Sequence, residues 1–249
     1  MSALPEDTQM EWTDEGIVLG VRRQGETSVI LEAMTHHHGR HLGVVRGGRS
    51  RTLQPVLQPG NAVQVTWRAR LDDHLGHFAV EGLSLHASRF LSSRLALFGI
   101  SHVTVLLRLL PERDPHPSLH DALLEVVSVL ADPRLAPALV ARFELAILEE
   151  LGFGLDLSAC AATGEREDLI YVSPKTGRAV SRKAGAPWHG KLLPLPAFLL
   201  GQDGAPGPAD VADAYRLTRY FLERDVFGPR GITLPQGRQA LIEAALAAA

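Results

Sequence analysis

The sequence predicts an α+β fold in which a five-stranded β-barrel of the OB type is followed by an α-helical domain. Short runs rich in β-branched and aromatic residues occupy residues 12–85 of the 249-residue chain, and apolar residues at helical spacing dominate the rest of the chain. The period changes between these two parts. We therefore expect a barrel domain over residues 1–85 and a helical domain over residues 86–249.

Five short runs are expected to form the strands of the barrel. Several of them alternate apolar and polar residues with a period of two, and clusters of Gly, Pro, Asn and Asp between them supply turns. An OB barrel commonly binds oligonucleotides or oligosaccharides, but a five-stranded SH3-like barrel gives the same pattern. The expected strands are residues 16–21, 28–31, 42–45, 62–67 and 78–83.

Apolar residues recur at helical spacing from Phe90 onward, and their stripes are best explained as a shared bundle core. A loop-rich segment is expected over residues 153–196 and a further loop over residues 201–208. The expected helices are residues 90–110, 119–130, 138–151, 208–227 and 236–246, with Tyr215, Leu217, Phe221 and Leu222 facing inward in the fourth.

A basic surface is expected on the barrel, although the chain has a net charge of −3. No Asp or Glu occurs between Glu32 and Asp72. Screening over roughly 10 Å lets a clustered patch attract phosphate while distant carboxylates have little effect. A polyanion is the simplest partner, and a solvated basic loop without function is the alternative. The arginines of this stretch are Arg40, Arg46, Arg49, Arg51, Arg68 and Arg70.

Trp67 lies in the arginine-flanked run 63–70, where its ring would stack on a base. A tryptophan in the barrel core is the alternative interpretation. The sequence contains no nucleophile elbow, P-loop, dinucleotide fingerprint or His-Glu-x-x-His motif. We therefore expect a binding protein and not an enzyme.

Two segments contain residue types that can ligate a metal, and neither segment is expected to bind a metal ion. His36, His37, His38 and His41 are interpreted as part of a turn, because adjacent histidines on a strand point to opposite faces and no carboxylate or cysteine is near them in the sequence. Residues 158–190 have the spacing of a zinc ribbon, but only Cys160 is a ligand type. We expect no metal and no cofactor.

The composition favours a cytoplasmic protein. One cysteine cannot form an intramolecular disulfide. Residues 1–10 lack the basic and apolar regions of a signal peptide, and no apolar stretch approaches the roughly 18 residues that span a bilayer. Contact with a membrane is not expected, and DNA binding would associate the protein with the nucleoid.

Four motifs resemble the RecO family of bacterial recombination mediators, in order and over nearly the whole chain. They are Glu15-Gly-Ile-Val-Leu19, the Gly39-Arg40 turn with residues 43–49, Arg142-Phe-Glu-Leu-Ala146 leading to Leu151-Gly-Phe153, and the segment from Cys160 to Ala184. The resemblance implies an N-terminal OB fold, a helical C-terminal domain and a zinc-ribbon insertion. Thr163, Ser181 and Ala184 replace three of its four cysteines, so we expect a degenerate ribbon without zinc.

The resemblance also implies a function. A family member binds single- and double-stranded DNA, anneals complementary strands, and acts with RecR to load recombinase onto DNA coated by single-stranded DNA-binding protein. Its helical domain binds the acidic tail of that coat protein, and Arg142 resembles a position in the tail-binding region. Pairing of Arg142 with Glu144 or Glu149 on the bundle surface is the structural alternative.

An annealing protein must hold strands mainly by their phosphates, because base edges have to stay free to pair, and flexible arginines suit this task. The alternative function is an adaptor for acidic protein tails, with DNA binding secondary. Its interaction would not depend on nucleic-acid length.

Overall fold

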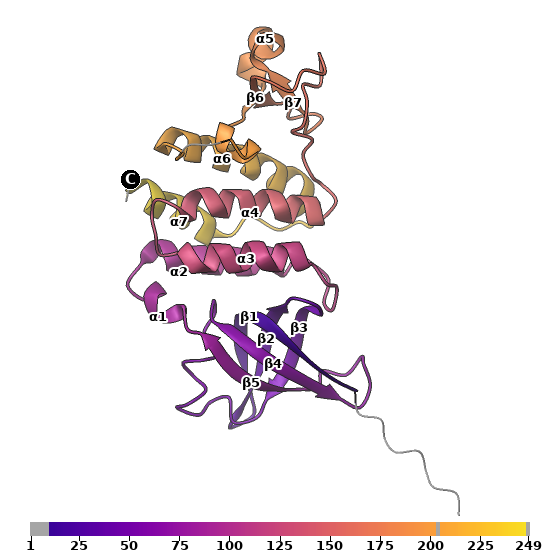
Figure 1. The fold of residues 1–249 in the computed structure, drawn as a ribbon, viewed down its shortest axis with the longest axis vertical. Helices are drawn as coiled ribbons and strands as arrows, with labels where there is room; N and C mark the ends of the chain where they lie inside the picture. The colour runs from indigo at the N-terminus through magenta and orange to yellow at the C-terminus, as the bar shows by residue number, and fades with distance from the viewer. Residues whose placement is uncertain (1–9, 203–204, 248–249) are drawn as a thin grey trace, which may run out of the picture. The chain divides into compact units, whose positions relative to one another are not determined.

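The computed structural model describes residues 10–202 and 205–247, and it divides into two compact units (Figure 1). Unit 1 comprises the described residues up to Ser93 together with Leu107–Ser128. Unit 2 comprises Arg94–Leu106 and the described residues from Val129 onward. The segment 1–9, for which no signal peptide was predicted, two residues of the predicted loop 201–208, and the last two alanines lie outside the described residues.

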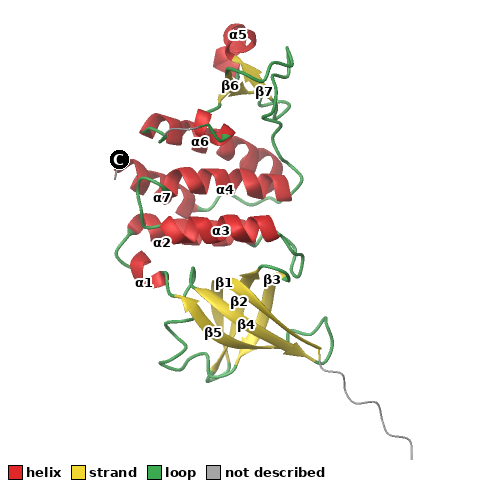
Figure 2. Ribbon diagram, viewed as in Figure 1, coloured by secondary structure: helices red, strands yellow, loops and turns green. Residues whose placement is uncertain are grey.

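The predicted five-stranded barrel is confirmed (Figure 2). The order around the barrel is β1-β2-β3-β5-β4, in which the long β1 pairs with both β2 and β4 and shifts its register with β2 between Val18 and Gly20. The circuit closes through a short parallel contact at Val44 and His77. The strands are β1 (Met10–Gln24), β2 (Ser28–Thr35), β3 (Gly39–Val45), β4 (Ala62–Ala69) and β5 (His77–Ser84).

The barrel interior is filled by the residues that alternate along its strands. In β3 and β4 every second residue is buried, as a strand with one face toward the core requires. Each large apolar side chain buried in this way contributes about 1.5–3 kcal/mol to the free energy of unfolding. The buried cluster comprises Val18, Val29, Leu31, Ala33, Val45, Leu57, Val63, Val65, Trp67, Ala69 and Phe78.

Unit 1 also contains α1 (Ala87–Phe90) and α3 (Pro117–Val129), whose first residue, a proline, suits a helix start. The boundary expected at residue 85 lies next to the end of β5, but α3 is grouped with the barrel. The segment before α3 runs beside β3, because the backbone N–H of Arg113 donates to the carbonyl of Arg40 at 2.9 Å. Gly39 has a φ of +64°, and a Cβ there would lie 2.0 Å from the Asp114 carbonyl oxygen.

Unit 2 is built mainly from helices: most of α2 (Arg94–Leu107), α4 (Ala136–Glu150), α6 (Pro208–Phe221) and α7 (Gln236–Ala247). The helix α6 continues as a π-helical turn, η3 (Leu222–Phe227), so the predicted helix over residues 208–227 is confirmed. Its four predicted inward residues are all buried. No helix of the described residues has the length and hydrophobicity that crossing a membrane requires.

The segment predicted to be loop-rich contains short elements that periodicity missed. A three-stranded sheet in the order β7-β6-β8 is formed by β6 (Leu169–Val172), β7 (Ala179–Ser181) and β8 (Leu193–Pro194). Strands of two to four residues are too short to show a period. The short helices α5 (Arg182–Gly185) and η1 (Ala186–Lys191) also lie in this segment, and η2 (Ala197–Leu200) follows it.

Candidate nucleic-acid interface

The arginine loop that follows β3 is anchored to the barrel by its backbone. The N–H of Arg49 donates to the carbonyl of Thr27 at 3.1 Å, which places the loop beside the β1–β2 turn. The guanidinium of Arg49 donates to the carbonyl of Glu26 in that same turn. Further along, the side chain of Leu57 is buried in the barrel core. The loop therefore presents its side chains from a fixed base.

Arg46, Arg49 and Arg51 have exposed side chains. Arg51 makes no hydrogen bond or ion pair with any residue that the structure describes. Arg46 has one long contact, 3.5 Å from Nη2 to Nε2 of His77. An exposed guanidinium has five N–H donors in a planar fork, which matches two oxygens of a phosphate. These three side chains are therefore available to a polyanion.

A shallow pocket next to this loop brings Arg46 together with Arg68 of β4 and His77 of β5. Arg68 donates to both carboxylate oxygens of Glu11, at 2.8 and 3.0 Å, and this hydrogen bonding lowers the pKa of Glu11. Both side chains are about half exposed, and exposed ion pairs contribute little to stability. The ion pair therefore adds little to the stability of the barrel. Arg70 follows β4 directly and is also exposed.

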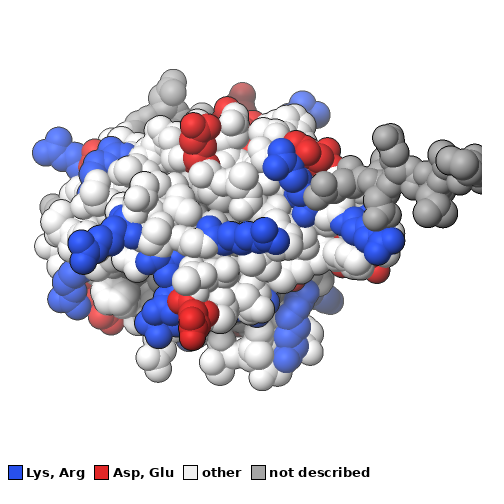
Figure 3. All heavy atoms as spheres, turned by 90° about the horizontal axis from the view of Figure 1, so that it is seen from below, with Lys and Arg blue, Asp and Glu red and all other residues white. Residues whose placement is uncertain are grey.

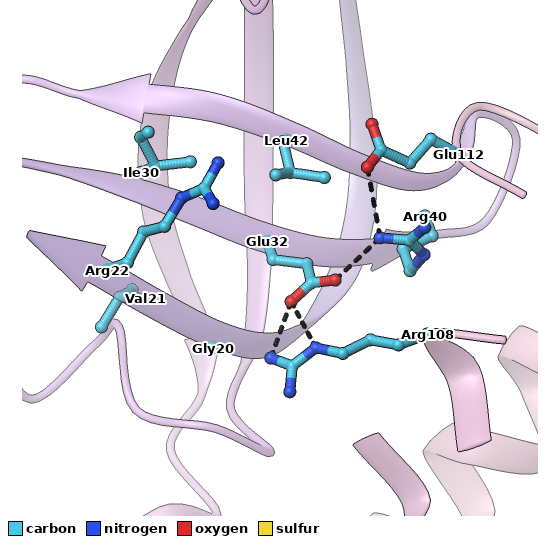
Figure 4. A pocket seen from close by; sticks show the side chains of 9 residues that line it. All are labelled: Gly20, Val21, Arg22, Ile30, Glu32, Arg40, Leu42, Arg108 and Glu112. Carbon is cyan, nitrogen blue, oxygen red and sulfur yellow. Dashed lines mark hydrogen bonds and ion pairs between the residues drawn. The ribbon is translucent and has the colours of Figure 1, made fainter. Parts of the chain in front are cut away.

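Arg40 does not belong to this surface, and its prediction as a DNA-binding residue is corrected. Its Nη1 lies 2.9 Å from Glu32 and 3.5 Å from Glu112, and its Nη2 donates to the carbonyl of Leu110 at 3.1 Å. Figure 4 shows Glu32 between Arg40 and a second arginine, Arg108. Only 11% of the Arg40 side chain is exposed. Arg40 therefore fastens the segment before α3 to β3.

Trp67 does not stack on a base, because its side chain is fully buried in the barrel core. Its indole N–H donates to the carbonyl of Leu75 at 3.1 Å, and its ring stacks on Trp12 at 5.7 Å between centroids. The core alternative is therefore the correct interpretation. The stacking prediction was wrong because the alternation of residues along a strand does not show which face of that strand lies in the core.

Two basic residues beside the loop were missed by sequence reasoning. Arg22 and Arg23 are exposed at the end of β1, next to the β1–β2 turn that the Arg49 backbone contacts. Neither forms an ion pair with a described residue. Arg22 lines the pocket shown in Figure 4. Arg22 and Arg23 precede the acid-free stretch in the sequence, so charge patterning did not identify them. The pairing of β1 with β2 brings them near the arginine loop. Figure 3 shows basic side chains spread over the face seen from below, with carboxylates beside several of them.

Arg142, the predicted tail-binding residue, is exposed on α4. Its Nε and Nη2 both donate to the carbonyl of Phe198, at 3.1 and 2.6 Å, and its guanidinium lies 6.0 Å from the centre of the Phe198 ring. The predicted alternative partners are therefore not used. The contact to Phe198 uses Nε and Nη2 of Arg142 and not its Nη1 amino group.

A second charged cluster in unit 2 is closed to solvent. Glu144 of α4 accepts hydrogen bonds from His102, Arg238 and Thr218. The side chains of His102 and Glu144 are fully buried, and 4% of the Arg238 side chain is exposed. A group that no substrate can reach cannot serve as an acid or base, so this cluster is structural.

The predicted degenerate ribbon brings three of its four positions together, because Ser181 and Thr163 both hydrogen-bond Cys160. The backbone N–H of Ser181 donates to Sγ of Cys160 at 3.3 Å, and Cys160 is buried. Thr163 also hydrogen-bonds the carboxylate of Glu165, and Ala184 lies in α5. Hydroxyl and methyl groups here are not ligands of structural zinc. The absence of zinc from this segment stays a prediction.

The histidine turn differs from its interpretation in one respect. The sequence showed no carboxylate near it, but the structure places Asp14 of β1 and Asp121 of α3 beside it. Asp14 accepts from the backbone N–H of His37 at 2.7 Å and lies 2.9 Å from Nδ1 of His38. Asp121 lies 3.5 Å from Nε2 of His36. The sequence expectation was wrong because both aspartates are distant in the chain.

Comparisons with known proteins agree on one family. Residues 10–85 match the model for the N-terminal part of recombination protein O, and residues 92–231 match the model for its C-terminal part. The chain is 60% identical over 238 residues to a DNA repair protein RecO of Methylobacterium nodulans, covering 94% of this chain and 97% of the relative. Proteins of the same name from Chelativorans sp. and Sinorhizobium medicae are 60% and 56% identical, covering 95% and 96% of this chain and 96% of each relative.

Proposed function

The chain belongs to the RecO family of DNA repair proteins, and from this premise we propose that it is a non-enzymatic recombination mediator. It binds single- and double-stranded DNA by the phosphates and anneals complementary strands. With RecR, it loads recombinase onto DNA that is coated by single-stranded DNA-binding protein. Association with the nucleoid follows from DNA binding.

One observation carries the DNA-binding part of the proposal. Arg46, Arg49 and Arg51 project from a loop whose backbone is fastened to the barrel, and exposed arginines flank it on β1 and β4. Contacts from such side chains reach phosphate oxygens and leave base edges free. The proposed DNA face comprises Arg22, Arg23, Arg46, Arg49, Arg51, Arg68 and Arg70.

The non-enzymatic part is supported by the burial of the acid–base cluster formed by His102, Glu144 and Arg238 in unit 2. The arginines of the proposed DNA face donate hydrogen bonds and carry positive charge, which suits a phosphate backbone. Their guanidinium groups do not transfer protons at neutral pH. The acidic tail of the coat protein is assigned to α4 near Arg142, where an amino group beside an aromatic ring suits a carboxylate.

The test is salt-dependent binding of fluorescently labelled single-stranded DNA. Changing Arg46, Arg49 and Arg51 together to Ala should weaken binding and reduce the salt slope by about 0.7 for each phosphate that is no longer bound. The matched control removes the same charge from exposed positions of unit 2, by changing Arg166, Lys175 and Lys183 to Ala. This control should bind nearly as the wild type does.

An unchanged slope in the folded barrel variant would overturn the DNA face. Equal losses in both variants would show that total charge, and not a site, determines binding. Tail binding that persists while DNA binding is weak in the wild type would favour the adaptor function instead.

A further inference from the structure

Three ligand-type side chains from two distant segments meet in unit 1. His36 lies in the turn between β2 and β3, and His120 and Asp121 lie near the start of α3. Nε2 of His36 and Nδ1 of His120 lie 3.5 and 3.4 Å from the same oxygen of Asp121. One ligand atom from each residue lies within 4.8 Å of the other two.

These separations are long for hydrogen bonds and fit a shared cation. Strong N–H···O hydrogen bonds are about 2.7–3.2 Å long. In a tetrahedral site with bonds of about 2.0–2.1 Å to nitrogen and oxygen, neighbouring ligand atoms lie about 3.3–3.4 Å apart. The two contacts of the Asp121 oxygen are close to that value.

A chain of hydrogen bonds leaves one nitrogen of His36 unprotonated and pointing at Asp121. The carboxylate of Asp14 can only accept, so Nδ1 of His37, 3.0 Å away, donates to it. In a neutral ring Nε2 of His37 then accepts, and its neighbour at 3.2 Å, Nδ1 of His36, is the donor. Nε2 of His36 consequently carries no proton, and its lone pair faces a carboxylate oxygen. Metal-binding imidazoles are oriented in the same way, by a hydrogen bond that the other ring nitrogen donates.

His120 also has a lone pair that no described residue uses. Its ring is buried, and its Nε2 has no hydrogen-bond partner among the described residues. If Nδ1 carries the proton, the Nε2 lone pair is buried without a donor. If Nε2 carries it, the Nδ1 lone pair faces the Asp121 oxygen. A cation bound by Nδ1 would use this second lone pair and fix the proton on Nε2.

We propose that His36, His120 and Asp121 form a binding site for one divalent transition-metal ion of the zinc type. Two imidazoles and one carboxylate suit Zn²⁺, Co²⁺ or Ni²⁺, whereas Mg²⁺ and Ca²⁺ prefer oxygen ligands alone. Asp121 is 68% exposed at its side chain, so the fourth position is open to water. The ion would tie the turn before β3 to the start of α3, both within unit 1.

The experiment titrates Co²⁺ into the full-length protein without a histidine tag and follows the visible absorption of the bound ion. One equivalent should bind, and Zn²⁺ should displace it. His36→Ala and Asp121→Asn should each weaken binding at least tenfold. The matched control is His74→Ala, an exposed histidine of the same unit, and Cys160→Ser tests the ribbon; neither should change binding.

Asp121 is exposed, so its variant should fold, and circular dichroism checks this. The absence of saturable Co²⁺ binding in the wild type would overturn the proposal. Binding that is unchanged in both His36→Ala and Asp121→Asn would do the same, as would abolished binding in the His74 or Cys160 variant.

Discussion

Arg238 of α7 donates two hydrogen bonds to the carboxylate of Glu144 on α4, at 2.7 Å from Nε and 2.9 Å from Nη2. Burial raises the pKa of Glu144, but the charge of Arg238 and the hydrogen bond of His102 outweigh it and hold the pKa at about 2. The carboxylate is therefore ionised throughout the neutral range. Thr218 of α6 and His102 of α2 donate to the same carboxylate, so one side chain links its own helix to three others.

Glu144→Gln should strongly destabilise the protein. The variant leaves Arg238 buried without a counter-charge, and breaking a buried pair in this way costs about 3–5 kcal/mol. Urea unfolding followed by circular dichroism measures the loss. Glu149→Gln is the control, because Glu149 is exposed on the same helix and should change stability by less than about 0.5 kcal/mol. Similar midpoints for the two variants would contradict the role of Glu144.

Gly39→Ala should cost much more stability than Gly25→Ala. Both glycines have a positive φ, +64° and +63°, so both substitutions carry the same backbone penalty of about 1–2 kcal/mol. A Cβ at position 25 meets nothing within 4 Å, whereas one at position 39 would lie 2.0 Å from the backbone of Asp114. Thermal melts of the two variants measure the difference. Equal melting temperatures would show that the segment before α3 does not pack against the turn.

His41 should make the barrel sensitive to acid. Burial among Trp12, Trp67 and Phe78 lowers its pKa from 6.5 to about 4, against a hydrogen bond to the Leu42 carbonyl that raises it. Above pH 6.5 the ring is neutral in both the folded and unfolded states, so its contribution is constant. Between pH 6.5 and 4 only the unfolded state takes up the proton, so stability falls. Below that window no further loss arises from this group.

His41→Phe removes the titrating ring and keeps an aromatic side chain in the core. The wild type should lose about 1–2 kcal/mol more than the variant between pH 7 and pH 5, allowing for solvent screening. Urea unfolding at the two pH values measures this. His74→Ala, which alters an exposed histidine, should retain the wild-type loss. The same loss in wild type and His41→Phe would assign the acid sensitivity to other groups.

Periodicity was enough to predict the strands and long helices, because burial on one face is a local property of the sequence. It could not predict the partners of single side chains. Arg40 looked like its exposed neighbours until the chain returned about 70 residues later to place Leu110 and Glu112 beside it. The same holds for His36, whose neighbour Asp121 comes from α3. Charge patterning located the basic loop but not the ion pairs that remove Arg40 from it.

Arg142→Ala should weaken binding of an acidic peptide that ends in aromatic and carboxylate groups. A charge-assisted hydrogen bond to arginine contributes about 1.5–3 kcal/mol, so the affinity should fall by one to two orders of magnitude. DNA binding should be nearly unchanged, because the arginine loop belongs to unit 1 and Arg142 to unit 2. Titration of a labelled tail peptide into each protein measures the first effect, and the labelled single strand measures the second.

Two further variants separate the binding role of Arg142 from its contact with Phe198. Arg134→Ala removes an exposed arginine just before the same helix and should bind the peptide as the wild type does. Arg142→Lys keeps the charge but loses the planar fork, so its affinity should be intermediate. Equal peptide affinities for wild type and Arg142→Ala would place the tail site elsewhere on the protein. A parallel loss of DNA binding in Arg142→Ala would instead mean that both ligands share one surface, because a substitution on α4 alone should not weaken DNA binding by the barrel.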